Sequence, residues 1–294
     1  MSQAKSRGLA VSEEANLRRW SAADEAWRGY RTVDGHVEYE DRVLRAFDLA
    51  LPTGGVLLDI GCADGVISSA LGQVARARDV VGVDFALIRS RVPTCVCNLD
   101  SSHFLPFRDG AFDVVTCLET LEHVHDTDHL VREVSRVLHP KGYAIFSVPR
   151  LDGLLNIGML AFGLQPPGVD CSLERRYGTG EPDRRVSGHV SHFSRRAFEQ
   201  MLTSRGFVIE AFRQASIYSG WVSATPPGQA AAWKRIPLWA LSKLPFKQDD
   251  QIVRVRRSVR PTRRPSGGRV RRLTSEGVCR SPLAQRRSAQ RLRP

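Results

Sequence analysis

The chain has 294 residues, enough for one substantial core in one or two domains, and its 42% hydrophobic and 25% charged residues are typical of a soluble globular protein. The sequence contains no apolar run of the roughly 20 residues that cross a bilayer, and residues 1–5 lack the apolar core of a signal peptide. We therefore expect a cytoplasmic location. The net charge of +12 does not indicate a nucleic-acid-binding domain, because residues 251–294 alone carry 14 arginines and one glutamate.

The first strand signal is the apolar run 56–60, which follows an expected helix over 12–27 and a second over 38–51. It ends in Asp59-Ile60 and leads into a turn bounded by Gly61 and Gly65, after which a helix is expected to about residue 74. Glycines permit tight backbone conformations and close approach, and a helix N-terminus directs N–H groups at its neighbour. This turn therefore predicts a site for a ligand that carries a carboxylate or a phosphate.

A second buried strand is predicted over 79–85 and again ends in an acid, Asp84. A carboxylate at the end of the neighbouring strand can accept hydrogen bonds from two adjacent ribose hydroxyls, and Phe85 can pack on a purine. In the alternative interpretation, Asp84 caps a helix that begins at Ala86 and Phe85 belongs to the core.

A third strand, over 94–97, precedes Asn98 and the segment LPFRDGAFDVV at 105–115. Together with Asp-x-Gly-x-x-x-Gly at 59–65, this segment resembles the class I S-adenosylmethionine-dependent methyltransferases of type 11 and type 23, which are related to quinone-biosynthesis enzymes. The resemblance covers roughly residues 38–150. The chain has Ala63 where the family has glycine, for which we expect a negative φ, and Asn98 where the family usually has aspartate.

The resemblance implies S-adenosylmethionine as cofactor. The glycine turn would hold its amino-acid end, Asp84 its ribose, and Asn98, with Asp100 as the alternative, its adenine amino group. The implied cofactor-binding residues are Asp59, Gly61, Cys62, Gly65, Asp84, Phe85, Asn98, Leu99 and Leu118.

Four further strands are expected, over 112–117, 143–148, 207–211 and 251–255, with helices that begin near Asp126 and at Arg195. The alternation of strands and helices predicts an α/β, doubly wound Rossmann-like fold. With the first three strands this makes a seven-stranded sheet, mostly parallel, whose closing strand is antiparallel by the resemblance.

The expected organisation has a helical or flexible segment, a methyltransferase domain and a tail. Their bounds are 1–37, 38–255 and 256–294, with a substrate lid at 150–190 and a partly helical excursion at 213–249. The tail is rich in Arg, Ser, Pro and Gly and is expected to be disordered. A role in binding nucleic acid or an anionic surface competes with the interpretation that it has no evolved role.

Histidine is the side chain that titrates near neutral pH, so His189 and His192 in GHVSHFS are candidate general bases. His123, in the LETLEHV turn that resembles a turn of the family, is a third. Each could instead order the turn that contains it. The histidines and the six cysteines show no metal-ligand spacing, so we expect no metal and reduced thiols.

The sequence thus predicts in-line methyl transfer from S-adenosylmethionine to a small-molecule or lipid-like acceptor. One alternative is an NAD(P)-dependent oxidoreductase on a similar sheet, although the chain lacks the G-x-G-x-x-G fingerprint. Another is a non-catalytic protein that binds S-adenosylmethionine and carries a basic arm.

Overall fold

The computed structural model describes residues 29–33, 36–86, 90–172, 174–178, 186–215 and 249–258. Several expectations fall outside these ranges. They are the helix over 12–27, most of a helix after Ala86, the excursion from residue 216 to 248, the tail from residue 259, and Cys279.

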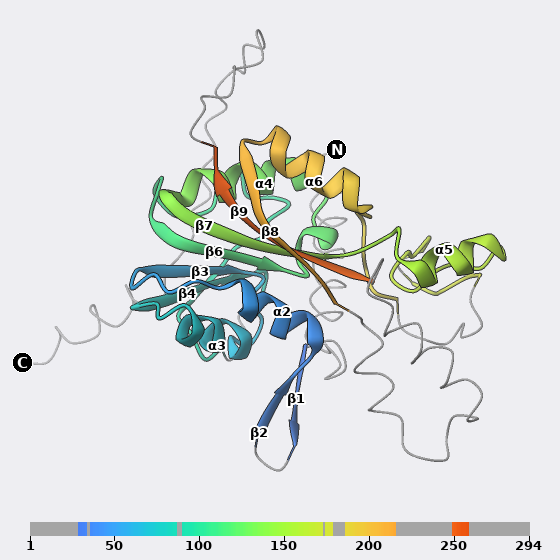
Figure 1. The fold of residues 1–294 in the computed structure, drawn as a ribbon, viewed down its shortest axis with the longest axis horizontal. Helices are drawn as coiled ribbons and strands as arrows, with labels where there is room; N and C mark the ends of the chain where they lie inside the picture. The colour runs from blue at the N-terminus through green and yellow to red at the C-terminus, as the bar shows by residue number, and fades with distance from the viewer. Residues whose placement is uncertain are drawn as a thin grey trace, which may run out of the picture.

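The centre of the described structure is a seven-stranded sheet in the order β5-β4-β3-β6-β7-β9-β8 (Figure 1). The strands are β3 (Val56–Ile60), β4 (Asp79–Asp84), β5 (Thr94–Val96), β6 (Phe112–Leu118), β7 (Leu138–Pro149), β8 (Phe207–Ala215) and β9 (Asp250–Arg257). Strands β3 to β7 pair in parallel, and β9 pairs antiparallel with both β7 and β8. The prediction of a mostly parallel doubly wound sheet with an antiparallel closing strand is confirmed.

Helices cover both faces of this sheet, because successive strand residues point to opposite sides. Neighbours such as Leu57 and Leu58 lie in two different core clusters. Helices α4 (Thr127–Val137) and α6 (Arg195–Ser204) cover one face, and α2 (Asp41–Leu49) and α3 (Val66–Val74) cover the other (Figure 1).

The helix ends follow local capping chemistry. The side chain of Asp126 accepts a hydrogen bond from the backbone N–H of His129 at the start of α4, and Ser194 accepts from Ala197 at the start of α6. Helix α3 begins after Gly65, whose φ of 72° places it in the left-handed region. The turn between β3 and α3 therefore depends on glycine at this position.

Several element boundaries differ from the expected ones. The helix expected from residue 38 begins at Asp41, because β1 (Tyr30–Val33) and β2 (His36–Tyr39) form an antiparallel hairpin before it. Strand β8 extends to Ala215, so residues 213–215 belong to the sheet and not to the expected excursion. Strand β9 extends to Arg257, and Arg256 bonds the backbone carbonyl of Lys141 and the Glu210 carboxylate.

Strand β7 also begins earlier than expected. Leu138 pairs with Phe112, and after a register shift Tyr143 pairs with Val114, so residues 139–142 bulge out of the strand. Helix α4 ends at Val137, directly before this part of the strand.

Helix α5 (Leu154–Ala161) lies beyond the carboxyl ends of the parallel strands (Figure 1). Its buried Asn156 donates to the carbonyl of Arg150 at the end of β7. In the part of the chain that the structure describes, every helix is too short or too polar to span a membrane.

Candidate functional site

The carboxyl end of β3 leads directly into the predicted glycine turn. Asp59 is buried beneath it, and its two carboxylate oxygens accept hydrogen bonds from Thr116 Oγ1 (2.6 Å) and Ser68 Oγ (2.5 Å). Asp59 therefore connects three neighbours of the turn, namely β3, β6 and the start of α3.

Residue 61 must be glycine for two reasons, its backbone conformation and the lack of space for a side chain. Its φ is 79°, and a Cβ at this position would lie 2.0 Å from Thr120 Oγ1. The turn after β6 thus packs directly on the turn after β3. The expectation of a negative φ at Ala63 is wrong: its φ is 46°, so alanine adopts the left-handed region where glycine would be unstrained.

Asp84 lies at the end of β4, beside this turn. Val83 pairs with Ile60, and Asp84 Oδ2 accepts a hydrogen bond from the backbone N–H of Ala63 (2.8 Å). Its Oδ1 accepts from the N–H of Ala86 (3.3 Å), as the capping interpretation also requires. Burial raises the pKa of the Asp84 carboxyl above its usual range.

Cys62 and Phe85 differ in exposure within the same region. Cys62 is buried, and its Sγ lies 3.6 Å from Thr94 Oγ1 and over Gly82, where a Cβ would clash with it. The Cys62 side chain therefore faces the interior, and a cofactor contact through its backbone stays a prediction. Phe85 is half-buried, which leaves both its core and its purine-packing interpretations as predictions.

The polar residues after β5 are engaged locally. Asn98 Oδ1 accepts from the backbone N–H groups of Asp100 (3.0 Å) and Ser101 (3.4 Å), and the Asp100 carboxylate accepts from His125. Leu99 is half-buried and packs on the core. An adenine contact by either polar side chain stays a prediction.

Leu118 ends β6, and its carbonyl accepts a hydrogen bond from Thr120 Oγ1 (2.9 Å). Between them Glu119 has a φ of 49°, which is unusual for a residue with a side chain. Its carboxylate accepts from Ser147 Oγ (2.7 Å) and forms an ion pair with Arg42 (3.1 Å). These bonds hold the strained turn between β7 and α2.

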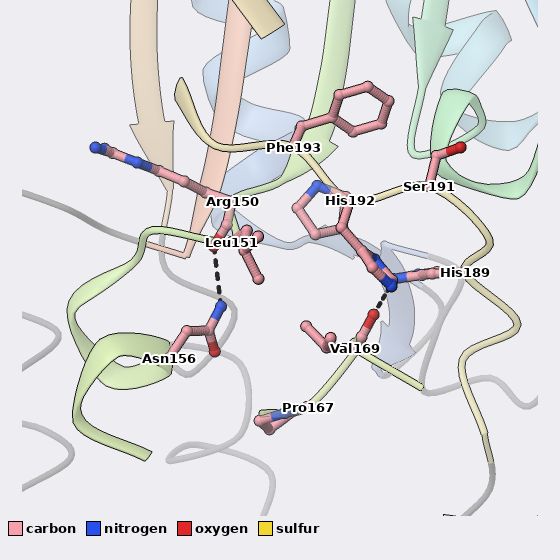
Figure 2. Close-up of a pocket in the computed structure, with 11 residues that line it drawn as sticks. Arg150, Leu151, Asn156, Pro167, Val169, His189, Ser191, His192 and Phe193 are labelled. Carbon is pink, nitrogen blue, oxygen red and sulfur yellow. Dashed lines mark hydrogen bonds between the residues drawn. The ribbon is translucent and has the colours of Figure 1, made fainter. Parts of the chain in front are cut away.

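A small pocket lies at the carboxyl end of β7 (Figure 2). Its lining residues are Pro149, Arg150, Leu151, Asn156, Pro167, Gly168, Val169, His189, Ser191, His192 and Phe193. Two of the three predicted histidines are therefore pocket residues, and His192 is the more exposed of the two. Burial lowers the pKa of His192.

The third predicted histidine, His123, stacks edge-on against His189 with ring centroids 4.8 Å apart. Burial lowers the pKa of His123 to about 3 and that of His189 to about 4, so both rings are neutral at pH 7. Glu122 lies beside them, with Oε1 4.0 Å from His123 Nε2 and 3.9 Å from His189 Nε2. The sequence reasoning did not select Glu122.

Comparison with known proteins identifies the family. A family model described as a methyltransferase domain matches residues 29–211. The chain belongs to this methyltransferase family. The match sets aside the nicotinamide-dependent oxidoreductase as an alternative.

Curated relatives share only part of their length with this methyltransferase. A ubiquinone biosynthesis O-methyltransferase from Chromobacterium violaceum is 36% identical over 107 residues, which is 32% of this chain and 44% of that protein. A protein of the same name from Bordetella avium is 32% identical over 105 residues, or 32% of this chain and 42% of that protein. The chain thus spans less than half the length of these relatives.

Solved structures agree with the fold. A complex between the Haloferax volcanii Trm112 methyltransferase activator and a methyltransferase contains a chain that matches with a TM-score of 0.54 and 14% identity. The match covers 74% of this chain and 89% of that one. At this identity the likeness shows the fold alone.

The residues at the strand ends have the chemistry that S-adenosylmethionine requires. A carboxylate offers about four lone-pair positions, and the Asp84 oxygens each accept one backbone N–H, so acceptor capacity remains for ribose hydroxyls. The turn at 61–65 would hold the amino-acid end, beside the carbonyl of Leu118. The described groups therefore fit the cofactor.

The buried carboxyl group of Asp59 should make the stability of the folded chain depend on pH. Burial raises the pKa of its carboxyl to about 6, despite the hydrogen bonds from Ser68 and Thr116. Because the folded chain holds this proton more tightly than the unfolded chain, the stabilisation is complete below about pH 4 and is lost as the pH rises through 6. We expect the free energy of unfolding of the cofactor-free wild type, relative to Asp59→Asn, to fall by about 2.4 kcal/mol between pH 4 and 7. Urea titrations of both proteins at several pH values measure this difference in the free energy of unfolding. A difference that does not change with pH would contradict the prediction.

Proposed function

We propose that this methyltransferase transfers the methyl group of S-adenosylmethionine to an oxygen of a small, partly apolar acceptor, which binds in the pocket at the end of β7. The observation that carries the proposal is the position of this pocket. It lies at the same edge of the sheet as the Asp84 carboxylate and the glycine turn, and pockets of α/β sheets form at this edge. Oxygen as the acceptor atom is supported by the curated relatives, which are named O-methyltransferases.

The surface beside the pocket supports an apolar or lipid-like acceptor. Four apolar residues of α5 and the segment after it are exposed, namely Ile157, Leu160, Phe162 and Leu164. Phe162 is 85% exposed, which is unusual for an aromatic side chain in a soluble domain. An acceptor with a hydrocarbon portion could cover this surface while its polar end enters the pocket. On this proposal residues 150–190 select the acceptor.

S-adenosylmethionine, when bound, supplies a methyl group on a cationic sulfur, so the chain must position the acceptor, exclude water and hold a proton. His192 lines the pocket and presents an imidazole to the acceptor hydroxyl. The carbonyl of Gly168 accepts from His189 Nδ1 (2.8 Å) and orients that ring in the wall of the pocket (Figure 2).

A labelled-methyl transfer assay tests the acceptor class. The full chain is incubated with methyl-labelled S-adenosylmethionine and the small-molecule and lipid extracts of its source cells, and the products are analysed by mass spectrometry. We expect the label in an O-methyl group of an organic-soluble product. Label confined to nitrogen, to carbon or to nucleic acid would overturn the proposal, and so would cofactor binding without transfer to any fraction.

Two matched variants test the role of α5. Leu160 on α5 and Val208 at the amino end of β8 are both 51% exposed, but only Leu160 belongs to an element that lines the pocket, through Asn156. We expect Leu160→Asp to raise the KM for an apolar acceptor at least about tenfold, because it places a charge on the acceptor surface. Val208→Asp should leave the KM unchanged, and both variants should bind S-adenosylhomocysteine normally. Equal kinetics in the two variants would remove α5 from the acceptor site.

A further inference from the structure

The hairpin of β1 and β2 reaches the glycine turn through one side chain. Tyr30, the first residue of β1, donates a hydrogen bond from its hydroxyl to Oδ2 of Asp64, which lies 34 positions later in the chain. Asp64 belongs to the turn between Gly61 and Gly65. Because Tyr30 is part of the segment 1–37, which is expected to lie outside the methyltransferase domain, the sequence does not predict this contact.

The base of the hairpin is fixed to helices α2 and α3. The carbonyl of Gly29 accepts a hydrogen bond from the N–H of Glu40 (2.9 Å), which closes the hairpin next to Tyr30. Gly29 is buried, and a Cβ at this position would lie 2.9 Å from Val43 Cγ2 and 3.2 Å from Ile67 Cδ1. The backbone therefore passes closely between a residue of α2 and a residue of α3, and this packing fixes where the Tyr30 side chain begins.

A series of aromatic contacts connects Tyr30 to the core. The centroids of the Tyr30 and Tyr39 rings are 6.5 Å apart, and Tyr39 packs edge-on against Phe47 with centroids 5.0 Å apart. Phe47 belongs to α2 and packs against the core cluster on that face of the sheet. The tip of the hairpin points away from the sheet and its base lies beside α2 (Figure 1). Tyr30 thus links a core helix to the glycine turn.

The turn that Tyr30 contacts needs support from its surroundings. Ala63 has a φ of 46°, and such a backbone persists only where neighbouring groups hold it. Asp84 holds one side of the turn from β4, through the N–H of Ala63. On the other side, Asp64 Oδ1 accepts from the N–H of Val66 (3.2 Å), the first residue of α3. The bond from Tyr30 to Oδ2 of the same carboxylate therefore ties this side of the turn to the hairpin.

We propose that Tyr30 is a positioning residue for the cofactor and that it acts through Asp64. By holding the Asp64 carboxylate, the hydroxyl of Tyr30 fixes the part of the turn that leads into α3, where the amino-acid end of S-adenosylmethionine would bind. Its O–H also offsets part of the negative charge of Asp64, which otherwise repels the carboxylate of the cofactor. Asp84 serves the ribose at the other side, so Tyr30 affects the amino-acid end alone. The proposal rests on the glycine turn as the cofactor site and not on the identity of the acceptor.

Two ligands that differ in the amino-acid end test the proposal on the full chain. S-adenosylhomocysteine has this end, whereas 5′-methylthioadenosine keeps only the adenine and the ribose. In isothermal titration calorimetry, Tyr30→Phe should weaken S-adenosylhomocysteine about tenfold, because a hydrogen bond to a charged group contributes roughly a factor of ten or more to an equilibrium constant. The affinity for 5′-methylthioadenosine should change less than about twofold. Tyr39→Phe is the matched control, since Tyr39 faces Tyr30 in the hairpin, and it should bind both ligands as the wild type does.

A double-mutant cycle tests whether Tyr30 acts through Asp64. Asp64→Ala should weaken S-adenosylhomocysteine at least as much as Tyr30→Phe does, and adding Tyr30→Phe to Asp64→Ala should weaken it no further. Gly29→Ala provides a second route to the same effect, because its Cβ displaces the base of the hairpin while the Tyr30 hydroxyl is kept. This variant should also weaken S-adenosylhomocysteine more than 5′-methylthioadenosine. Thermal unfolding checks that each variant is folded.

Three results would overturn the proposal while the cofactor assignment stands. They are wild-type affinity for both ligands in Tyr30→Phe, an equal loss for both ligands, and additive losses in the double variant with Asp64→Ala. The equal loss would show that Tyr30 only stabilises the turn as a whole. A wild type that binds neither ligand would overturn the cofactor assignment and this proposal together.

Discussion

Asp84→Ala is expected to weaken the binding of S-adenosylhomocysteine by roughly 100-fold to 10,000-fold. A carboxylate that accepts two ribose hydroxyls makes two charged hydrogen bonds of about 1.5–3 kcal/mol each, and each 1.4 kcal/mol corresponds to a factor of ten. The structure places the Asp84 carboxylate at the end of β4, against the glycine turn. Isothermal titration calorimetry on the purified chain measures the change.

The same strand offers a matched control. Asp79 begins β4 at the opposite edge of the sheet and pairs with Arg78 at the surface. Asp79→Ala should therefore bind the cofactor product as the wild type does. Because Asp84 also bonds the N–H of Ala63, 5′-methylthioadenosine, which keeps the ribose but lacks the amino-acid end, separates its two roles. Unchanged affinity for this compound in Asp84→Ala would show that Asp84 supports the turn but does not bind ribose.

The parts of the fold that could be predicted from the sequence are those whose sequence patterns extend over only a few neighbouring residues. The apolar runs of β3 and β4 carry an acid at or next to the last residue, namely Asp59 and Asp84. Like the helix caps at Asp126 and Ser194, these signals are complete within a few residues. The positions of the strand ends then follow from the rule that parallel strands bring their carboxyl ends to one edge. The Asp84–Ala63 contact is the direct result.

The features that could not be predicted depend on residues distant in sequence. The left-handed backbone of Ala63 is supported by the Asp84 carboxylate from another strand. Glu122 lies beside His189, which is 67 positions later in the chain, and the spacing of histidines and acids cannot show that these two segments meet.

Gly61→Ala is expected to abolish measurable cofactor binding and to lower the free energy of unfolding by about 2–5 kcal/mol. The left-handed backbone costs an L-residue about 1–2 kcal/mol, and forcing a methyl group into a packed site costs about 1–3 kcal/mol more. The new Cβ would lie 2.0 Å from Thr120 Oγ1, so the turn after β3 and the turn after β6 must move apart. Urea unfolding and calorimetry with S-adenosylhomocysteine measure the two effects.

Gly54 separates the backbone cost from the steric cost. Its φ of 67° is close to that of Gly61, but no heavy atom lies within 4 Å of a Cβ placed there. Gly54→Ala should therefore cost only the backbone contribution, about 1–2 kcal/mol, and should leave cofactor affinity unchanged. Adding Thr120→Ala to Gly61→Ala removes Oγ1 and Cγ2 but leaves a Cβ at 3.0 Å, so the double variant should recover part of the stability. If Gly54→Ala and Gly61→Ala lowered the free energy of unfolding by the same amount, the left-handed backbone alone would explain the need for glycine at residue 61. The contact with Thr120 would then contribute nothing to that need.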